Sequence, residues 1–111
     1  MSEHRLCALT GIADGGSAGF EIVESGRSVR LLAVRRGETV YVYENRCPHR
    51  RLPLDFKAGQ FLDAEKKHIL CTNHIALFRI EDGFCIDGPC QGERLRAIPA
   101  AVHGDDVFVT L

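Results

Sequence analysis

The chain has almost no net charge, few aromatic residues and no long apolar segment. Its 111 residues carry 14 Lys and Arg against 15 Asp and Glu, and only 7% of them are aromatic. Because the charges nearly cancel, nothing in the overall balance attracts nucleic acid or an anionic membrane. No stretch approaches the roughly 18 apolar residues of a membrane span, and the first residues lack the apolar run of a signal peptide. We therefore expect a cytoplasmic protein without nucleic-acid or membrane partners.

Several kinds of internal organisation are also missing. There is no repeat, low-complexity tract or linker, so residues 1–111 are expected to form a single domain. No segment shows a helical face of useful length, and residues 63–67 are expected to form at most a turn. The sequence also lacks a Ser-His-Asp set, paired carboxylates, a phosphate loop and a nucleotide-binding fingerprint. These absences indicate a protein that is not by itself an enzyme.

What the sequence does contain is a series of short segments with the two-residue period of strands, separated by turn residues. The strongest is TVYVY at residues 39–43, in which every residue is β-branched or aromatic. The other expected strands cover residues 19–25, 28–35, 68–71, 76–80, 84–86, 100–103 and 107–111. The pattern predicts an all-β fold of about nine short antiparallel strands, in stacked sheets or a partly closed barrel.

The alternation stops between residues 45 and 67, a region that contains two prolines and several basic residues. This region is expected to be a long loop, and long loops in compact domains are usually functional. The chain also has five cysteines, an odd number. In a reducing compartment that count indicates metal or redox chemistry before a disulfide framework.

Two cysteines and two histidines form paired motifs in this region and at its far edge. The first motif is C-P-H, with Cys47 and His49, and the second is C-T-N-H, with Cys71 and His74. Each motif brings one thiolate and one imidazole, so the two can close on a single metal centre from opposite sides. Any one of these residues could instead be an ordinary core or surface side chain, but the four together favour metal binding. A structural zinc site with two Cys and two His is an alternative at this point.

The two motifs resemble the fingerprint of the Rieske iron-sulfur proteins, C-x-H followed after a loop by C-x-x-H. The resemblance covers roughly residues 39–111. Outside the four motif residues, it includes Arg50, Pro53, Leu54, Leu77, Phe78, Gly88, Pro89 and Leu95. It implies a small antiparallel Rieske-like fold of stacked sheets with two cluster-binding loops. It also implies one [2Fe-2S] cluster per chain, with Cys47 and Cys71 on one iron and His49 and His74 on the other.

Histidine ligation has a direct electronic consequence. Two ferric ions, two sulfides, two thiolates and two neutral imidazoles sum formally to zero charge, so adding an electron is easier than with four thiolates. The resemblance therefore implies a one-electron carrier, a ferredoxin that passes electrons from a reductase to a terminal oxygenase. The small subunit of an NAD(P)H nitrite reductase looks similar in size and is an alternative.

The chain departs from patterns that are common in this family. Arg51 and Ile75 stand where many members have glycine, which bears on the geometry of the loops. The extra loop cysteines of membrane-complex Rieske proteins are missing, so their disulfide is not expected. Ala76 and Phe78 replace a serine and a tyrosine whose hydroxyls stabilise the reduced cluster in high-potential relatives. The resemblance thus implies a low-potential, ferredoxin-like centre.

The remaining cysteines and histidines are weaker candidates. Cys85 and Cys90 flank a turn and could form a disulfide or a second ligand pair, although structural roles are favoured. Cys7 is expected in the core. The histidines expected to have surface or structural roles are His4, His68 and His103.

A local excess of positive charge surrounds the first motif. It comes from Arg46, Arg50, Arg51 and Lys57, with Asp55 as the only acidic residue among them. The cluster is either a solvated loop or a docking patch for an acidic partner.

Overall fold

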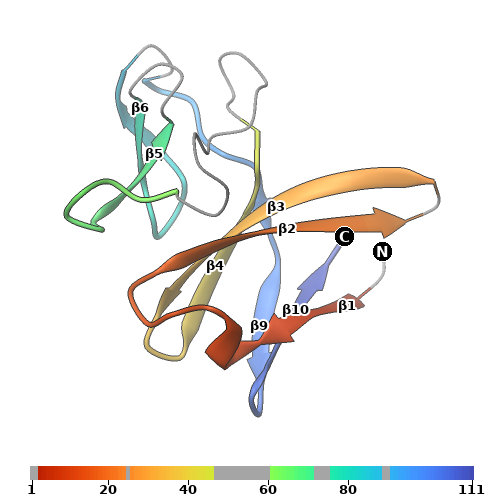
Figure 1. The fold of residues 1–111 in the computed structure, drawn as a ribbon. Helices are drawn as coiled ribbons and strands as arrows, with labels where there is room; N and C mark the ends of the chain where they lie inside the picture. The colour runs from red at the N-terminus through yellow and green to blue at the C-terminus, as the bar shows by residue number, and fades with distance from the viewer. Residues whose placement is uncertain (1–2, 25, 47–60, 72–75, 89–90) are drawn as a thin grey trace.

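The computed structural model describes residues 3–24, 26–46, 61–71, 76–88 and 91–111, which form ten strands and one short 3-10 helix (Figure 1). The elements are β1 (Glu3–Ala8), η1 (Leu9–Gly11), β2 (Ser17–Glu24), β3 (Arg27–Arg36), β4 (Thr39–Glu44), β5 (His68–Cys71), β6 (Ala76–Arg79), β7 (Cys85–Asp87), β8 (Ala97–Ile98), β9 (Ala100–His103) and β10 (Asp106–Thr110). All strand pairs are antiparallel. The all-β prediction is confirmed.

The strands are arranged in three sheets. The four-stranded sheet has the order β2-β3-β4-β8, and the two three-stranded sheets have the orders β1-β10-β9 and β5-β6-β7. In Figure 1 the β5-β6-β7 sheet lies at one end of the molecule, and β1, β9 and β10 lie at the other. The two ends of the chain meet in one sheet, since Glu3 of β1 is paired with Thr110 of β10. This arrangement corresponds to the stacked sheets expected from the sequence.

Strand β3 is buried on both faces over its central part. The four consecutive residues from Leu31 to Val34 are all at most 1% exposed. Leu32 and Val34 belong to one hydrophobic cluster, whereas Leu31 and Ala33 belong to another. Because successive side chains of a strand point to opposite faces, β3 separates the two clusters and contributes to both.

The two clusters connect the central sheet to its two neighbours. The first cluster comprises Leu32, Val34, Tyr43, Phe61, Ile69, Cys71, Ala76, Phe78, Ile80, Cys85 and Leu95. It therefore joins β3 and β4 to the β5-β6-β7 sheet. The second cluster comprises Ile12, Leu31, Ala33, Val42, Ile98 and Val109, and it joins β3 and β4 to the β1-β10-β9 side.

The observed elements differ from the expected ones in a few places. Strands β1 and β8 were not expected, and several other strands begin or end one or two residues away from the predicted bounds. Residues 63–67 form only turns and bends, as expected. Leu62, inside the predicted loop, makes a single antiparallel bridge to Ile69. No helix in the described part of the chain is long and apolar enough to cross a membrane.

Candidate metal centre

The two sequence motifs lie at the ends of described strands. Cys71 is the last residue of β5. Arg46 lies two residues beyond the end of β4, and Cys47 is the next residue in the sequence. Cys47, His49 and His74 lie outside the described residues, as do Arg51 and their basic neighbours Arg50 and Lys57. The predicted grouping of the four side chains therefore stays a prediction. Within the described residues, no group of three or more Cys, His, Asp or Glu side chains is placed so that it could hold a metal ion.

Cys71 is placed by a short strand whose side chains alternate in burial. Ile69 and Cys71 are both fully buried, and Cys71 is part of the first hydrophobic cluster. A bare thiolate at an apolar position is costly, because burial disfavours the charged form. Coordination to a metal removes this cost by balancing the negative charge. The location of Cys71 therefore fits a metal ligand, and equally fits a protonated core thiol in the protein without metal.

Ala76 is the direct partner of Cys71 across the β5-β6 hairpin, and Phe78 is the partner of Ile69. Directly opposed residues of an antiparallel pair point to the same face, about 4.5–5.5 Å apart at Cβ. Both Ala76 and Phe78 are fully buried in the first cluster. Neither side chain has a hydrogen-bond donor, so the wall beside Cys71 is entirely apolar at these two positions.

The residues preceding the first motif are held by backbone hydrogen bonds to two other segments. The amide of Glu44 donates to the carbonyl oxygen of Arg96 at 2.9 Å, and the amide of Asn45 donates to that of Arg30 at 2.8 Å. Arg46 adds an ion pair to Glu44 at 3.9 Å. The chain therefore reaches Cys47 from a fixed starting point at the end of β4.

The two strands that lead to the motifs share one core. Tyr43 of β4 belongs to the same cluster as Cys71, and its hydroxyl donates a hydrogen bond of 2.5 Å to the carbonyl oxygen of Ile80, just beyond β6. Burial raises the pKa of Tyr43, with smaller contributions from Asp82 and Glu81, so the hydroxyl stays protonated and remains a donor. This bond ties the end of β4 to the sheet that carries Cys71.

Asp63 closes the turn that leads into β5. Its carboxylate accepts hydrogen bonds from the amides of Lys67 (2.9 Å) and His68 (3.2 Å), and it lies 3.3 Å from the His68 ring. Burial alone would raise the pKa of Asp63, but the hydrogen bonds from the two amides and the ring together lower it. On the other side of this turn, Leu70 donates its amide to the carbonyl oxygen of Phe61 at 2.7 Å. The strand carrying Cys71 is therefore fixed at its start.

The other cysteines and histidines that the structure describes pack against or bond to neighbouring parts of the fold. Cys7 is partly buried beside the second cluster, where burial raises the pKa of its thiol. The Cys85 sulfur donates to the carbonyl oxygen of Asp87 at 3.2 Å, while Cys90 lies outside the described residues, so a link between the two stays untested. The His103 ring packs against Phe108 with ring centres 5.6 Å apart.

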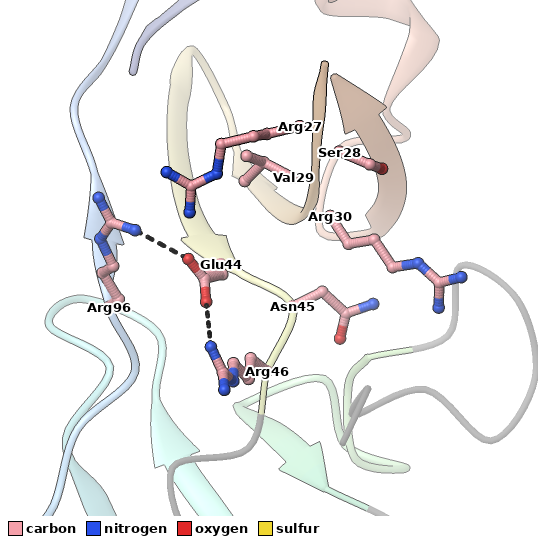
Figure 2. Close-up of a pocket in the computed structure, with 8 residues that line it drawn as sticks. All are labelled: Arg27, Ser28, Val29, Arg30, Glu44, Asn45, Arg46 and Arg96. Carbon is pink, nitrogen blue, oxygen red and sulfur yellow. Dashed lines mark hydrogen bonds and ion pairs between the residues drawn. The ribbon is translucent and has the colours of Figure 1, made fainter. Parts of the chain in front are cut away.

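Sequence analysis missed three basic residues that the fold brings to Arg46. Arg27 and Arg30 of β3 and Arg96 before β8 line a pocket together with it (Figure 2). The segments that carry them are far apart in the sequence, and no spacing rule links Arg27 and Arg30 to Arg46 or Arg96. Only the pairing of β3, β4 and β8 could have indicated their proximity.

Comparison with known proteins gives both a family and a set of similar folds. The family model described as the Rieske [2Fe-2S] domain matches residues 3–102. The ferredoxin of carbazole 1,9a-dioxygenase from Nocardioides aromaticivorans IC177 superposes with a TM-score of 0.75 and 26% identity, over 98% of this chain and 97% of that chain. A search of curated proteins found no match.

Two further solved structures are similar in fold. One is titled as a complex of reduced oxygenase and oxidised ferredoxin in carbazole 1,9a-dioxygenase, with a TM-score of 0.73 and 21% identity over 96% of this chain and 91% of that chain. The other is titled as the reduced complex between oxygenase and ferredoxin of the same system. It has a TM-score of 0.79 and 24% identity, over 96% of this chain and 27% of that chain.

The three antiparallel sheets define a small all-β protein. The chain belongs to the Rieske [2Fe-2S] domain family. Its cofactor is accordingly one [2Fe-2S] cluster per chain, and the zinc alternative is set aside. The donor chemistry fits this cofactor, because a Rieske centre takes thiolates on one iron and imidazoles on the other.

Proposed function

We propose that this protein is a Rieske-type ferredoxin, a one-electron carrier that receives electrons from a reductase and delivers them to a terminal oxygenase. The observation that carries the proposal is the family match over residues 3–102, joined to a 26% identical ferredoxin that aligns over nearly the whole of both chains. That relative is titled as the ferredoxin of a dioxygenase. The carrier role, and the absence of a reaction of its own, are brought to this chain on that basis.

The four proposed ligands are Cys47 and Cys71 on one iron and His49 and His74 on the other. When bound, the cluster supplies a site that takes up and gives back a single electron. The burial of Cys71 at the end of β5, beside the apolar side chains of Ala76 and Phe78, supports this assignment. Apolar surroundings of this kind limit the access of water to a metal site.

The proposal also covers the number of domains and the cellular location of the protein. The chain acts as a single Rieske domain over residues 1–111, in the cytoplasm, as a component of an oxidoreductase system rather than as an enzyme. The apolar clusters on both faces of β3 support a single domain, because they connect all three sheets.

The ligand assignment is tested by replacing each histidine. We expect His49→Ala and His74→Ala to prevent assembly of the native cluster, because each removes one of two imidazoles on the same iron. His103→Ala is the matched control, since His103 packs on Phe108 in the β9-β10 hairpin. The readouts are visible absorption and iron and sulfide content, expected near two of each per chain in the wild type and control. Wild-type absorption and iron in either ligand variant contradicts the assignment.

A further inference from the structure

The pocket beside the end of β4 is lined by four arginines from three separate segments. Arg27 and Arg30 come from β3, Arg46 follows β4, and Arg96 precedes β8 (Figure 2). The volume of the pocket is about 460 Å³, and its other lining residues are Ser28, Val29, Glu44 and Asn45. We call this feature the arginine pocket.

The base of the arginine pocket is rigidly built. The amide of Asn45 donates to the carbonyl oxygen of Arg30, and the amide of Glu44 donates to that of Arg96. Asn45 itself is buried, at 9% exposure. Backbone hydrogen bonds therefore join the three segments that carry the arginines.

Positive charge in the arginine pocket exceeds negative charge. Glu44 is the only acidic residue of the lining, and its carboxylate lies between Arg96, at 2.9 Å, and Arg46, at 3.9 Å (Figure 2). Arg30 has a distant contact of 3.8 Å with Glu21, outside the lining. Among the side chains that the structure describes, which do not include that of Glu24, none makes an ion pair with Arg27. This excess is local, because the whole chain has a net charge of −1.

The guanidinium groups are accessible from solvent. The side chains of Arg30, Arg46 and Arg96 are 63%, 49% and 72% exposed. An enclosed site for a small ligand would bury its charged groups, whereas these arginines present theirs outward around a concavity. Planar guanidinium groups favour bidentate pairing with carboxylates, and exposed charges steer association with a partner. These properties suit side chains carried in by another protein.

We propose that the arginine pocket is the docking site for surface carboxylates of the redox partner protein. The proposal rests on the proposed function, which supplies the partner. Arg46 immediately precedes Cys47, so a partner seated in the pocket lies beside the start of the first proposed ligand motif. Glu44 binds Arg96 closely, at 2.9 Å, whereas Arg30 and Arg46 have only long contacts, of 3.8 Å to Glu21 and 3.9 Å to Glu44. Arg27 and Arg30 make no ion pair with Glu44 and are the arginines proposed to receive the incoming carboxylates.

The test uses a fluorescein-labelled hexaglutamate peptide as a stand-in for an acidic partner surface. Its binding to the cluster-loaded protein is followed by fluorescence anisotropy at low ionic strength. We expect Arg27→Gln and Arg30→Gln each to weaken binding by about threefold or more, and the double variant by about tenfold or more. Added salt weakens binding to the wild type.

Arg36→Gln is the matched control. Arg36 stands at the other end of β3, about 30 Å from Arg27 by the rise of a strand, and the substitution changes the net charge equally. We expect peptide binding to change less than twofold in this variant. An equal loss in Arg36→Gln and Arg27→Gln shows that only overall charge matters, and overturns the proposal.

Glu44→Gln provides a variant with the opposite expectation. Removal of this carboxylate frees Arg46 and Arg96 and leaves the lining of the pocket without an acidic residue. Tighter peptide binding, by about threefold or more, is expected. Unchanged or weaker binding contradicts the charge arrangement on which the docking site depends.

A small-anion site is distinguished by competition with inorganic phosphate at constant ionic strength. Phosphate that binds more tightly than the peptide, and displaces it, overturns docking in favour of a small ligand. Visible absorption and iron content are measured on every preparation. A wild-type protein that lacks the cluster but binds peptide contradicts the proposed function alone, whereas a loaded protein that does not bind peptide contradicts the docking site alone.

Discussion

At position 76 a single methyl group faces Cys71 across the β5-β6 hairpin. The two residues are direct register partners, and both are fully buried. A hydroxyl placed there would lie on the same face as the sulfur of Cys71 and could donate a hydrogen bond to it or to a neighbouring sulfide. A substitution that adds one oxygen atom at this position is therefore a direct way to alter the electron affinity of the centre.

Ala76→Ser is expected to raise the reduction potential. A donor to sulfur stabilises the reduced state, which carries more negative charge, and a hydrogen bond of about 1 kcal/mol corresponds to about 40 mV for one electron. Protein-film voltammetry measures the shift, with Ala101→Ser on the exposed side of β9 as the control. An unchanged potential in Ala76→Ser shows that this position does not face the cluster.

Asp63 is expected to contribute stability that depends on pH. Its folded-state pKa is lower than its ordinary value of 3.8, so the contribution is present above that value and is lost as the pH falls through the folded pKa. Asp63→Ala should reduce the free energy of unfolding by about 1–2 kcal/mol at neutral pH, because the Lys67 and His68 amides lose their acceptor.

Urea unfolding followed by circular dichroism between pH 7 and pH 3 checks this expectation for Asp63. The difference in the free energy of unfolding between Asp63→Ala and the wild type should narrow at the acidic end. A difference that is constant over the whole pH range means that the carboxylate charge of Asp63 is not involved.

At the scale of elements, the β6-β7 turn is fitted closely to β4. Gly83 in this turn has φ of +72°, and a Cβ atom there would be 2.8 Å from the Tyr43 ring and 3.2 Å from Leu95. The turn therefore needs glycine for two reasons: a backbone conformation that side chains rarely adopt, and the lack of space. The hydrogen bond from Tyr43 to Ile80 depends on the same close approach.

Gly83→Ala separates these two reasons when it is compared with Gly104→Ala. Gly104 also has a positive φ, of +62°, but a Cβ atom there would meet nothing within 4 Å. We expect Gly104→Ala to cost about 1 kcal/mol and Gly83→Ala about 1–3 kcal/mol more, because the second must also displace packed side chains. Thermal unfolding midpoints measure both. Equal midpoints contradict the close packing of the turn against Tyr43.

Strong local patterns made most of the strands predictable from the sequence. Residues 39–43 are all β-branched or aromatic, and the observed strand β4 includes them. The predicted strand at residues 68–71 is also observed, as β5. Strand β8 was not predictable, because its two residues are extended only through pairing with β4, at Val42 and Tyr43. In β3, the apolar run from Leu31 to Val34 places apolar side chains on both faces, and the two flanking sheets bury both.

At the scale of the whole molecule, the sequence motifs and the tertiary structure carry different parts of the candidate site. The C-x-H and C-x-x-H motifs could be recognised because their chemistry depends on short spacings within one segment. The arginine pocket could not, because Arg27, Arg46 and Arg96 are brought together only when β3, β4 and β8 pair. A surface built in this way has no signature along the chain.

The proposed role is that of a low-potential Rieske carrier with two imidazole ligands, and the reduction potential as a function of pH tests this proposal most directly. Oxidation lowers the pKa of the ligand rings, so the potential should fall as the pH rises through those values. By protein-film voltammetry we expect about −150 to −50 mV at neutral pH, with a decline at alkaline pH. A pH-independent potential near −400 mV, typical of four-thiolate plant-type centres, contradicts histidine ligation, and a value above about +100 mV contradicts the ferredoxin role.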